Sequence, residues 1–160
     1  MQLDKPLWHY ISAVYSRPGV EATCLEAQRL GLQVNSLLFC GWLAQQRKIY
    51  ASNLFNAVEA QWRDPLLKPL RSLRYQLREL KLSQSGLTQC YESMKETELA
   101  LEKVDIAMLW QASHALPVVT APVDTADLAR QNMLLYARSV SLEKDDLYQV
   151  CCESLVQLIR

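Results

Sequence analysis

The sequence has few glycines and no long apolar run. Only four of its 160 residues are glycine, which argues against a β fold rich in turns. The longest apolar run, from Leu37 to Ala44, is much shorter than the roughly 20 residues that cross a bilayer. The N-terminal segment MQLDKPLW lacks the apolar region of a secretory signal. We therefore expect a cytoplasmic protein that is not inserted in a membrane.

An excess of charge of either sign is also missing. The 17 Lys and Arg residues balance 17 Asp and Glu residues, so the whole molecule has no net attraction to nucleic acid or to an anionic membrane. Half of the residues are hydrophobic, which is typical of globular proteins and not of disordered ones. We expect a single helical domain over residues 1–160, long enough to bury a hydrophobic core.

Residues that could form a catalytic or metal site are sparse. The two histidines, His9 and His114, are far apart, and the chain has neither a glycine-rich phosphate loop nor a Gly-x-Ser-x-Gly motif. The five cysteines are odd in number and include no Cys-x-x-Cys pair, which indicates free thiols in a reducing compartment. We expect no catalytic residue, no metal site and no cofactor, and the sequence favours a protein without enzymatic activity.

Apolar residues recur at helical spacing along almost the whole chain. This pattern predicts an all-α fold, a compact bundle of six to eight helices. Asn35 or Ser36 is expected to cap the third helix, Asp124 or Thr125 the seventh and Ser141 the last. Asp64-Pro65 is expected to stop the fourth helix. The third helix is apolar on nearly every face and is expected at the centre of the core. The predicted helices cover about residues 6–15, 18–30, 37–46, 52–62, 66–82, 88–114, 124–139 and 141–159.

Residues 66–114 are predicted to form a long αα-hairpin, because two long helices joined by a short turn normally lie antiparallel. The helical core is expected over residues 6–114, and a linker with two prolines follows at 115–123. Residues 124–160 then form a C-terminal pair of helices. This pair either folds back on the core, which is the favoured interpretation, or docks on another chain, including a second copy in a homodimer.

A stripe of basic side chains follows one face of the predicted helix 66–82, opposite a row of leucines. Its members are Lys68, Arg71, Arg74, Arg78 and Lys81. Such a stripe could contact successive phosphates of a nucleic acid, or it could bind an acidic protein. The favoured interpretation is that it pairs with acidic residues of the helix 88–114. The expected pairs are Arg78 with Glu92, Arg74 with Glu96 and Lys68 with Glu102.

The N-terminal stretch carries a set of residues at defined spacings: Leu7-Trp8, Tyr15–Val20 (YSRPGV), Cys24-Leu25, Gln28 and Val34–Leu43 (VNSLLFCGWL). In these residues the chain resembles a family of short, uncharacterised proteobacterial proteins known only as conserved hypothetical proteins. The resemblance covers roughly residues 7–44. It implies a bacterial origin and a helical fold, and it implies no activity, cofactor or partner.

Several positions of this motif could line a ligand pocket between helices. They are Trp8, Tyr15, Arg17, Asn35 and Trp42. Aromatic residues at helical spacing more often belong to the core, and that interpretation is favoured here. Arg17 stands at a tight corner between two helices, where C-terminal carbonyl groups of a helix are its expected partners.

The leading hypothesis is therefore a non-enzymatic cytosolic interaction or adaptor protein that binds another protein. The first alternative is a nucleic-acid-associated or regulatory protein that uses the basic stripe at 68–81. The second alternative is a small-molecule binder or enzyme that uses the aromatic N-terminal face. Each alternative needs residues that are free to contact a ligand, so the positions of these side chains in the fold decide between them.

Overall fold

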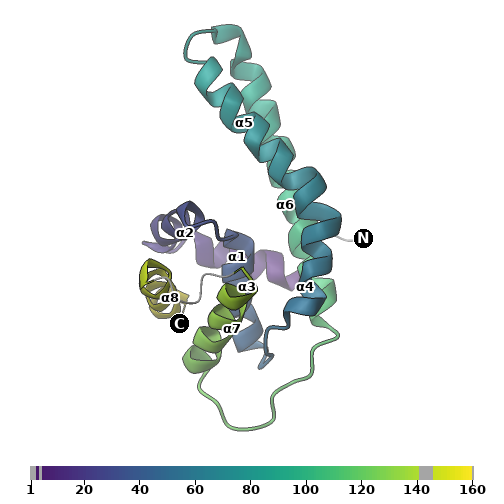
Figure 1. Ribbon diagram of the computed structural model, residues 1–160, viewed down its shortest axis with the longest axis vertical. Coiled ribbons are helices and arrows are strands. Elements are labelled where there is room, and N and C mark those ends of the chain that lie inside the picture. The colour runs from purple at the N-terminus through teal and green to yellow at the C-terminus, as the bar shows by residue number, and fades with distance from the viewer. Residues whose placement is uncertain (1–2, 4, 141–145, 160) are drawn as a thin grey trace.

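Almost the whole backbone is helical in the computed structural model, which describes residues 3, 5–140 and 146–159 (Figure 1). The prediction of an all-α bundle is confirmed. Within the described residues, each helix is too short or too polar to cross a membrane. The elements are α1 (Pro6–Tyr15), α2 (Val20–Arg29), α3 (Val34–Gln45), α4 (Ser52–Val58), the π-helix η1 (Glu59–Leu67), α5 (Lys68–Leu80), the short 3₁₀-helix η2 (Ser85–Leu87), α6 (Thr88–Ser113), α7 (Thr125–Ser139) and α8 (Asp146–Ile159).

Helix α3 is the centre of the core. Every residue from Ser36 to Ala44 is buried, as the apolar pattern on nearly every face of this helix predicts. The predicted start of the helix is wrong, because α3 begins at Val34 and not after a cap at Asn35 or Ser36. Both side chains lie in its first turn and bind groups on other helices, so they are unavailable as caps.

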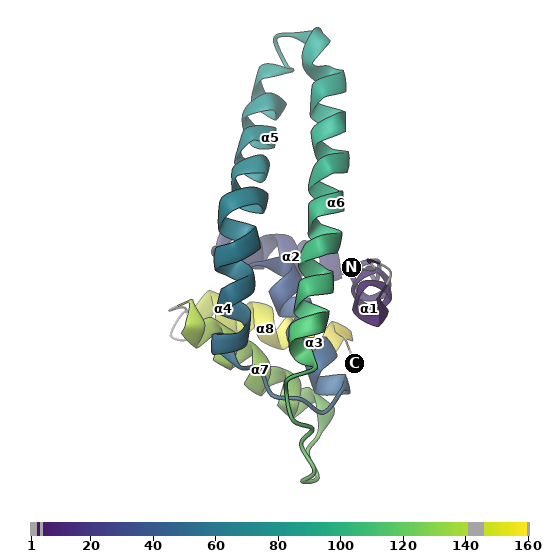
Figure 2. The ribbon, with the colours of Figure 1, turned by 90° about the vertical axis from the view of Figure 1, so that its right-hand side faces the viewer.

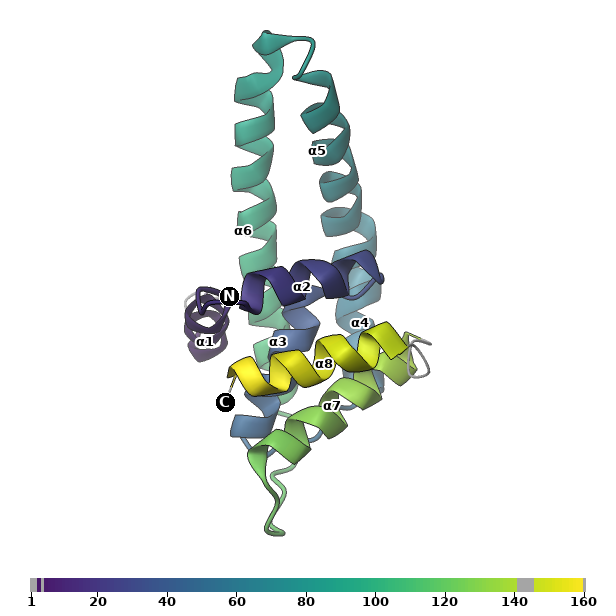
Figure 3. The same ribbon diagram turned by 90° about the vertical axis from the view of Figure 1, so that its left-hand side faces the viewer.

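The C-terminal helices cover this core. Helix α7 packs along α3, and α8 packs against α2 and α7 (Figure 3). The side chain of Asn132 on α7 is fully buried and accepts a hydrogen bond from the Tyr50 backbone N–H at 2.8 Å. It also donates to the carbonyl groups of Cys40 and Lys48 at 3.2 and 3.0 Å. One side chain therefore ties α7 to both α3 and the loop that follows it.

The ends of α7 and α8 fit the expected signals in part. Of the two predicted caps, Asp124 and Thr125, it is Asp124 that caps α7, since its carboxylate accepts hydrogen bonds from the backbone N–H groups of Ala126 and Asp127. The predicted cap at Ser141 lies outside the described residues. The linker 115–123 is attached to the loop after α3, where Arg47 donates to the carbonyls of Val119 and Ala121 at 3.0 and 2.6 Å.

The prediction that Asp64-Pro65 stops a helix is wrong. Elements α4, η1 and α5 follow one another without a break, and Pro65 lies inside the π-helical part. In an α-helix the proline ring would clash with the carbonyl four residues before it. The wider π-turn moves that carbonyl away, so the chain accepts Pro65 without ending the helix. The hairpin is therefore longer than expected, because its first arm begins at α4.

This first arm runs antiparallel to α6, and the far half of the hairpin extends beyond the rest of the molecule (Figures 1 and 2). None of the residues of α5 is buried, in contrast with α3. One side of the hairpin faces α1, α2 and the core. Figure 2 shows the opposite side, which the other helices leave uncovered along its length.

Candidate functional site

A cleft separates the base of the hairpin from α1 and α2. Its volume is about 370 Å³, within the range of small-ligand and peptide pockets. Aromatic and apolar groups share the walls with amide and charged groups. The wall of α1 and α2 includes Trp8, Tyr15, Leu25 and Gln28, the base includes Gln33 and Asn35, and the hairpin wall includes Arg71, Arg74, Tyr75, Glu98, Leu99 and Glu102.

A second, wider hollow adjoins the cleft and forms its mouth. It shares Tyr15, Arg74, Glu98, Leu99 and Glu102 with the cleft. The further residues of the mouth are Glu21 on α2 and Glu92, Lys95 and Glu96 on α6. Five carboxylates and two basic groups therefore line the mouth, which makes it acidic.

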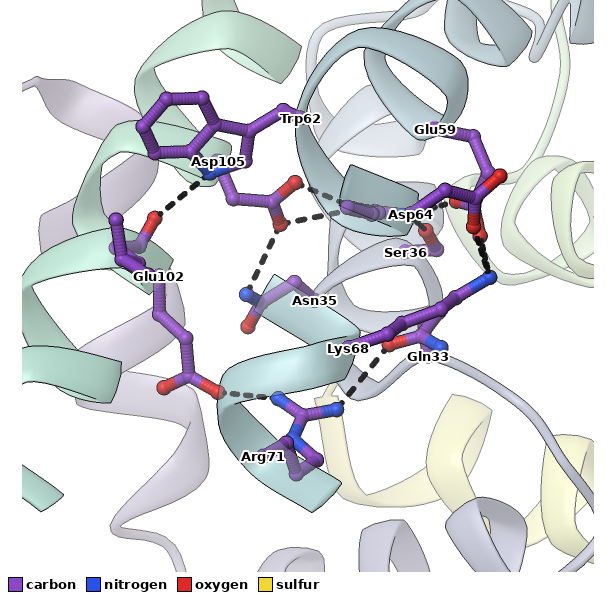
Figure 4. A network of polar contacts seen from close by, with 12 residues as sticks. Gln33, Asn35, Ser36, Glu59, Trp62, Asp64, Lys68, Arg71, Glu102 and Asp105 are labelled. Carbon is purple, nitrogen blue, oxygen red and sulfur yellow. Dashed lines mark hydrogen bonds and ion pairs between the residues drawn. The ribbon is translucent and has the colours of Figure 1, made fainter. Parts of the chain in front are cut away.

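Two arginines hold the hairpin wall in place. Arg71 donates to Glu98 at 2.8 Å, to Glu102 at 2.7 Å and to the side chain of Gln33 at 3.3 Å. Figure 4 shows the guanidinium of Arg71 between Glu102 and Gln33. Arg74 also donates to Glu98, and its guanidinium lies 4.6 Å from the ring centre of Tyr75. Both arginines are thus neutralised by carboxylates at the cleft.

The two carboxylates at this wall have pKa values shifted in opposite directions. Burial acts to raise the pKa of Glu98, but the hydrogen bonds from Arg74 and Arg71 outweigh it and hold the pKa below its ordinary value. Burial raises the pKa of Glu102, and the charge of Glu98 adds to this although Arg71 opposes it. Glu98 therefore stays ionised, whereas Glu102 accepts a proton more readily than an exposed glutamate.

A second ionic group lies behind the cleft and joins three elements. Arg63 in η1 donates to both carboxylate oxygens of Asp105 on α6 at 2.6 and 2.9 Å. It also donates to the hydroxyl of Ser36 at 2.7 Å, and Asn35 donates to Asp105 at 3.1 Å (Figure 4). Asp105 is fully buried and Arg63 is 4% exposed. This group fixes the base of the hairpin to the start of α3.

Sequence reasoning misses the pair of Arg63 and Asp105, although a signal for it exists. The side of α6 that faces α5 is formed by residues three or four positions apart. Most of these residues are apolar: Tyr91, Met94, Leu101 and Met108. Glu98 and Asp105 interrupt this row, seven residues apart. Charged residues at such positions are buried, so they require basic partners on the facing helix.

The structure separates the members of the basic stripe. Arg71 and Arg74 line the cleft, whereas Lys68 pairs within its own helical segment, at 2.6 Å from both Glu59 and Asp64. Arg78 pairs with Glu79 at 3.2 Å, and the Lys81 ammonium lies 3.9 Å from the ring centre of Tyr91. Each basic side chain of the stripe thus has a partner inside the molecule.

Other ion pairs replace the three that were expected across the hairpin, and Arg78 and Lys68 pair within their own arm. Arg74 pairs with Glu98 and not with Glu96, a shift of two residues on α6. Two residues correspond to a rotation of about 200° around a helix, so Glu98 faces α5 while Glu96 lies at the cleft mouth. Glu102 pairs with Arg71 in place of Lys68.

The motif positions are also divided among three places. Trp8, Tyr15 and Asn35 line the cleft. Trp42 is 7% exposed and stacks on Phe39 in the core, with ring centres 6.0 Å apart. Arg17 lies outside the cleft and donates to the carbonyl of Leu158, near the C-terminal end of α8, at 3.2 Å.

The remaining reactive side chains form no metal site within the described part of the chain. All five cysteines are free thiols. Cys90 is exposed, and the buried ones are Cys24, Cys40, Cys151 and Cys152. Burial raises the pKa of Cys24 and of Cys152 to about 12, so these two thiols stay protonated at neutral pH.

Comparisons with known proteins give a family and no activity. Neither a search of curated proteins nor a search of solved structures found a match. A family model described as "Protein of unknown function (DUF2390)" matches residues 6–109. The matched region includes every residue that lines the cleft, ends within α6 and stops before α7 and α8. Because the match covers more than half of the chain, the protein belongs to this family of proteins of unknown function.

Proposed function

We propose that this protein is an interaction module that binds a segment of another protein in the cleft. The observation that carries the proposal is the composition of the cleft. Aromatic side chains from α1 and α5 line its inner part, and carboxylates from α2 and α6 line its mouth. An open groove of this kind accepts a peptide whose apolar side chains enter the inner part while its main chain passes along the mouth.

The charges at the mouth favour a basic segment. Glu21 and Glu96 stand on opposite walls, one on α2 and one on α6. Neither forms an ion pair with another residue in the described ranges. A lysine or arginine between them would meet two carboxylates that have no other cationic partner, and such complementarity gives specificity and faster association.

The same charges count against the nucleic-acid alternative. Arg71 and Arg74, the two members of the basic stripe at the cleft, are already paired with Glu98 and Glu102. A phosphate at this place would have to displace a carboxylate and would also face the acidic mouth. The affinity of proteins for nucleic acid depends on unpaired Lys and Arg side chains, which this surface does not offer.

We infer that the module acts in the bacterial cytoplasm. The free thiols support a reducing compartment, and the resemblance of residues 7–44 to proteobacterial proteins supports the bacterial origin. An adaptor connects two partners, so this role requires a second binding surface in addition to the cleft.

Selection of random 12-residue peptides displayed on phage against the full chain tests the proposal. We expect enriched peptides that combine Lys or Arg with aromatic or aliphatic residues. Their binding should weaken at least tenfold with the double substitution Glu21→Gln and Glu96→Gln, and it should weaken with added salt. Glu26→Gln, on the same helix α2 but paired with Arg29 outside the cleft, is the matched control and should change nothing.

Two results would contradict the proposal. One is the absence of any enriched peptide class, and the other is equal binding by the double variant and the wild-type chain. A fluorescent 20-nucleotide single-stranded RNA provides the comparison for the alternative. We expect no salt-dependent binding of this RNA, and binding that Arg71→Gln abolishes would favour the nucleic-acid function instead.

A further inference from the structure

We propose that two copies of this chain associate through the uncovered side of the hairpin, which we call the outer hairpin face. On the first arm, the residues that we assign to this face are Trp62, Leu66, Leu73 and Leu80. The proposal does not depend on what the cleft binds, because the outer hairpin face lies on the other side of the hairpin.

The leucines of this face are the first evidence. Leu66, Leu73 and Leu80 are seven residues apart and therefore share one side of the arm. Their exposed fractions are 44%, 46% and 48%, so about half of each side chain is open to solvent in the single chain. None of them lines the cleft or its mouth, and Figure 2 shows no other helix in front of this side. A repeat of seven along an exposed side is typical of a helix that packs on another helix.

The absence of charge on this side indicates which partner fits. The side chains beside the leucines at helical spacing are Pro69 and Gln76, both uncharged. Of the basic residues of the arm, Arg71 and Arg74 line the cleft and Arg63 binds Asp105 on α6. A second copy can therefore approach without repulsion between like charges, whereas an uncharged face offers no charge pattern that would select a different protein. Two-fold dimers are also the commonest oligomers, since one face then serves both copies.

The size of the face is sufficient for a specific contact. From Trp62 to Leu80 the arm is about 27 Å long at 1.5 Å per residue. Two helices side by side are about 20 Å wide, so each copy offers roughly 540 Å². The total of roughly 1,100 Å² exceeds the ~1,000 Å² expected of a biological interface. The product is a four-helix arrangement in which the two hairpins interdigitate.

Sedimentation equilibrium of the full chain between 1 and 100 µM tests the proposal. We expect a mass that rises with concentration to twice the 18.3 kDa of one chain. The double variant Leu73→Glu and Leu80→Glu should remain at 18.3 kDa and keep its helical circular dichroism, because both leucines are half-exposed in the single chain. Val150→Glu is the matched control, an exposed apolar residue on α8, and should leave the dimer intact.

Either of two outcomes would overturn the inference. A wild-type chain that stays at 18.3 kDa up to 100 µM excludes the dimer without any variant. A dimer that persists in the double variant excludes this face. If the double variant loses its helical signal, Leu73→Gln alone decides, with an expected increase of at least tenfold in the dissociation constant of the dimer. The monomeric variant should bind cleft peptides with unchanged affinity per site. Loss of the dimer and loss of peptide binding are therefore measured separately.

Discussion

Replacing Asp105 by asparagine should destabilise the protein more than any surface change of the same kind. Asp105 is fully buried and accepts two hydrogen bonds from Arg63 and one from Asn35. Asparagine keeps the shape but removes the negative charge, which leaves the buried guanidinium of Arg63 with only Glu59, at 3.2 Å, as an anionic partner. Breaking a buried ion pair by removing one partner costs about 3–5 kcal/mol.

For a chain of this length that loss corresponds to a decrease in melting temperature of about 6–20 °C. Thermal and urea unfolding followed by circular dichroism measure it. Asp64→Asn is the matched control, because Asp64 is 54% exposed and its pair with Lys68 is a surface pair. The double variant Arg63→Met and Asp105→Leu should recover most of the loss, since no buried charge remains. Equal melting temperatures for Asp105→Asn and Asp64→Asn would refute the reasoning.

Three further predictions concern other parts of the molecule. Glu98→Gln should lower the free energy of unfolding by about 2–3 kcal/mol at pH 7. The folded-state pKa of Glu98 is lowered, so this carboxylate stabilises the fold at pH values above its unfolded pKa near 4.3. The stabilisation is lost as the pH falls through the folded pKa. Urea unfolding should therefore show a smaller difference from wild type at pH 3, with Glu92→Gln as the exposed control. Asn132→Ala should lower the free energy of unfolding by about 2–4 kcal/mol, because it leaves one N–H and two carbonyl groups without their partner, whereas exposed Asn56→Ala should have little effect. A maleimide should label only Cys90 in the folded chain and all five cysteines in urea, and rapid native labelling of a second thiol would contradict the burial described above.

Much of the fold could be predicted from local pattern alone. The burial of α3, the cap at Asp124 and the hairpin turn each depend on residues close together in sequence. Pro65 shows where such reasoning fails. Its effect on a helix depends on whether the backbone can widen, and that depends on packing between η1 and α6, far apart in sequence.

The candidate site could be predicted only in pieces. Trp8 and Arg71 belong to separate predicted features, a motif and a charge stripe, and the fold brings them to one cleft. The hairpin register decides whether Glu96 or Glu98 meets the arginines, and two residues in α6 reverse the side on which a carboxylate lies. Charge pattern alone leaves several such registers open.

The opposite placement of the cleft and the outer hairpin face has a consequence for affinity. Two chains joined through their outer faces would carry one cleft each, on the two outer sides of the pair. A partner with two basic segments could then occupy both clefts, and the second binding step would proceed at the high effective concentration set by the first. Individually weak contacts would combine into strong avidity. A partner with one basic segment would bind more weakly than a partner with two, although each cleft makes the same contacts.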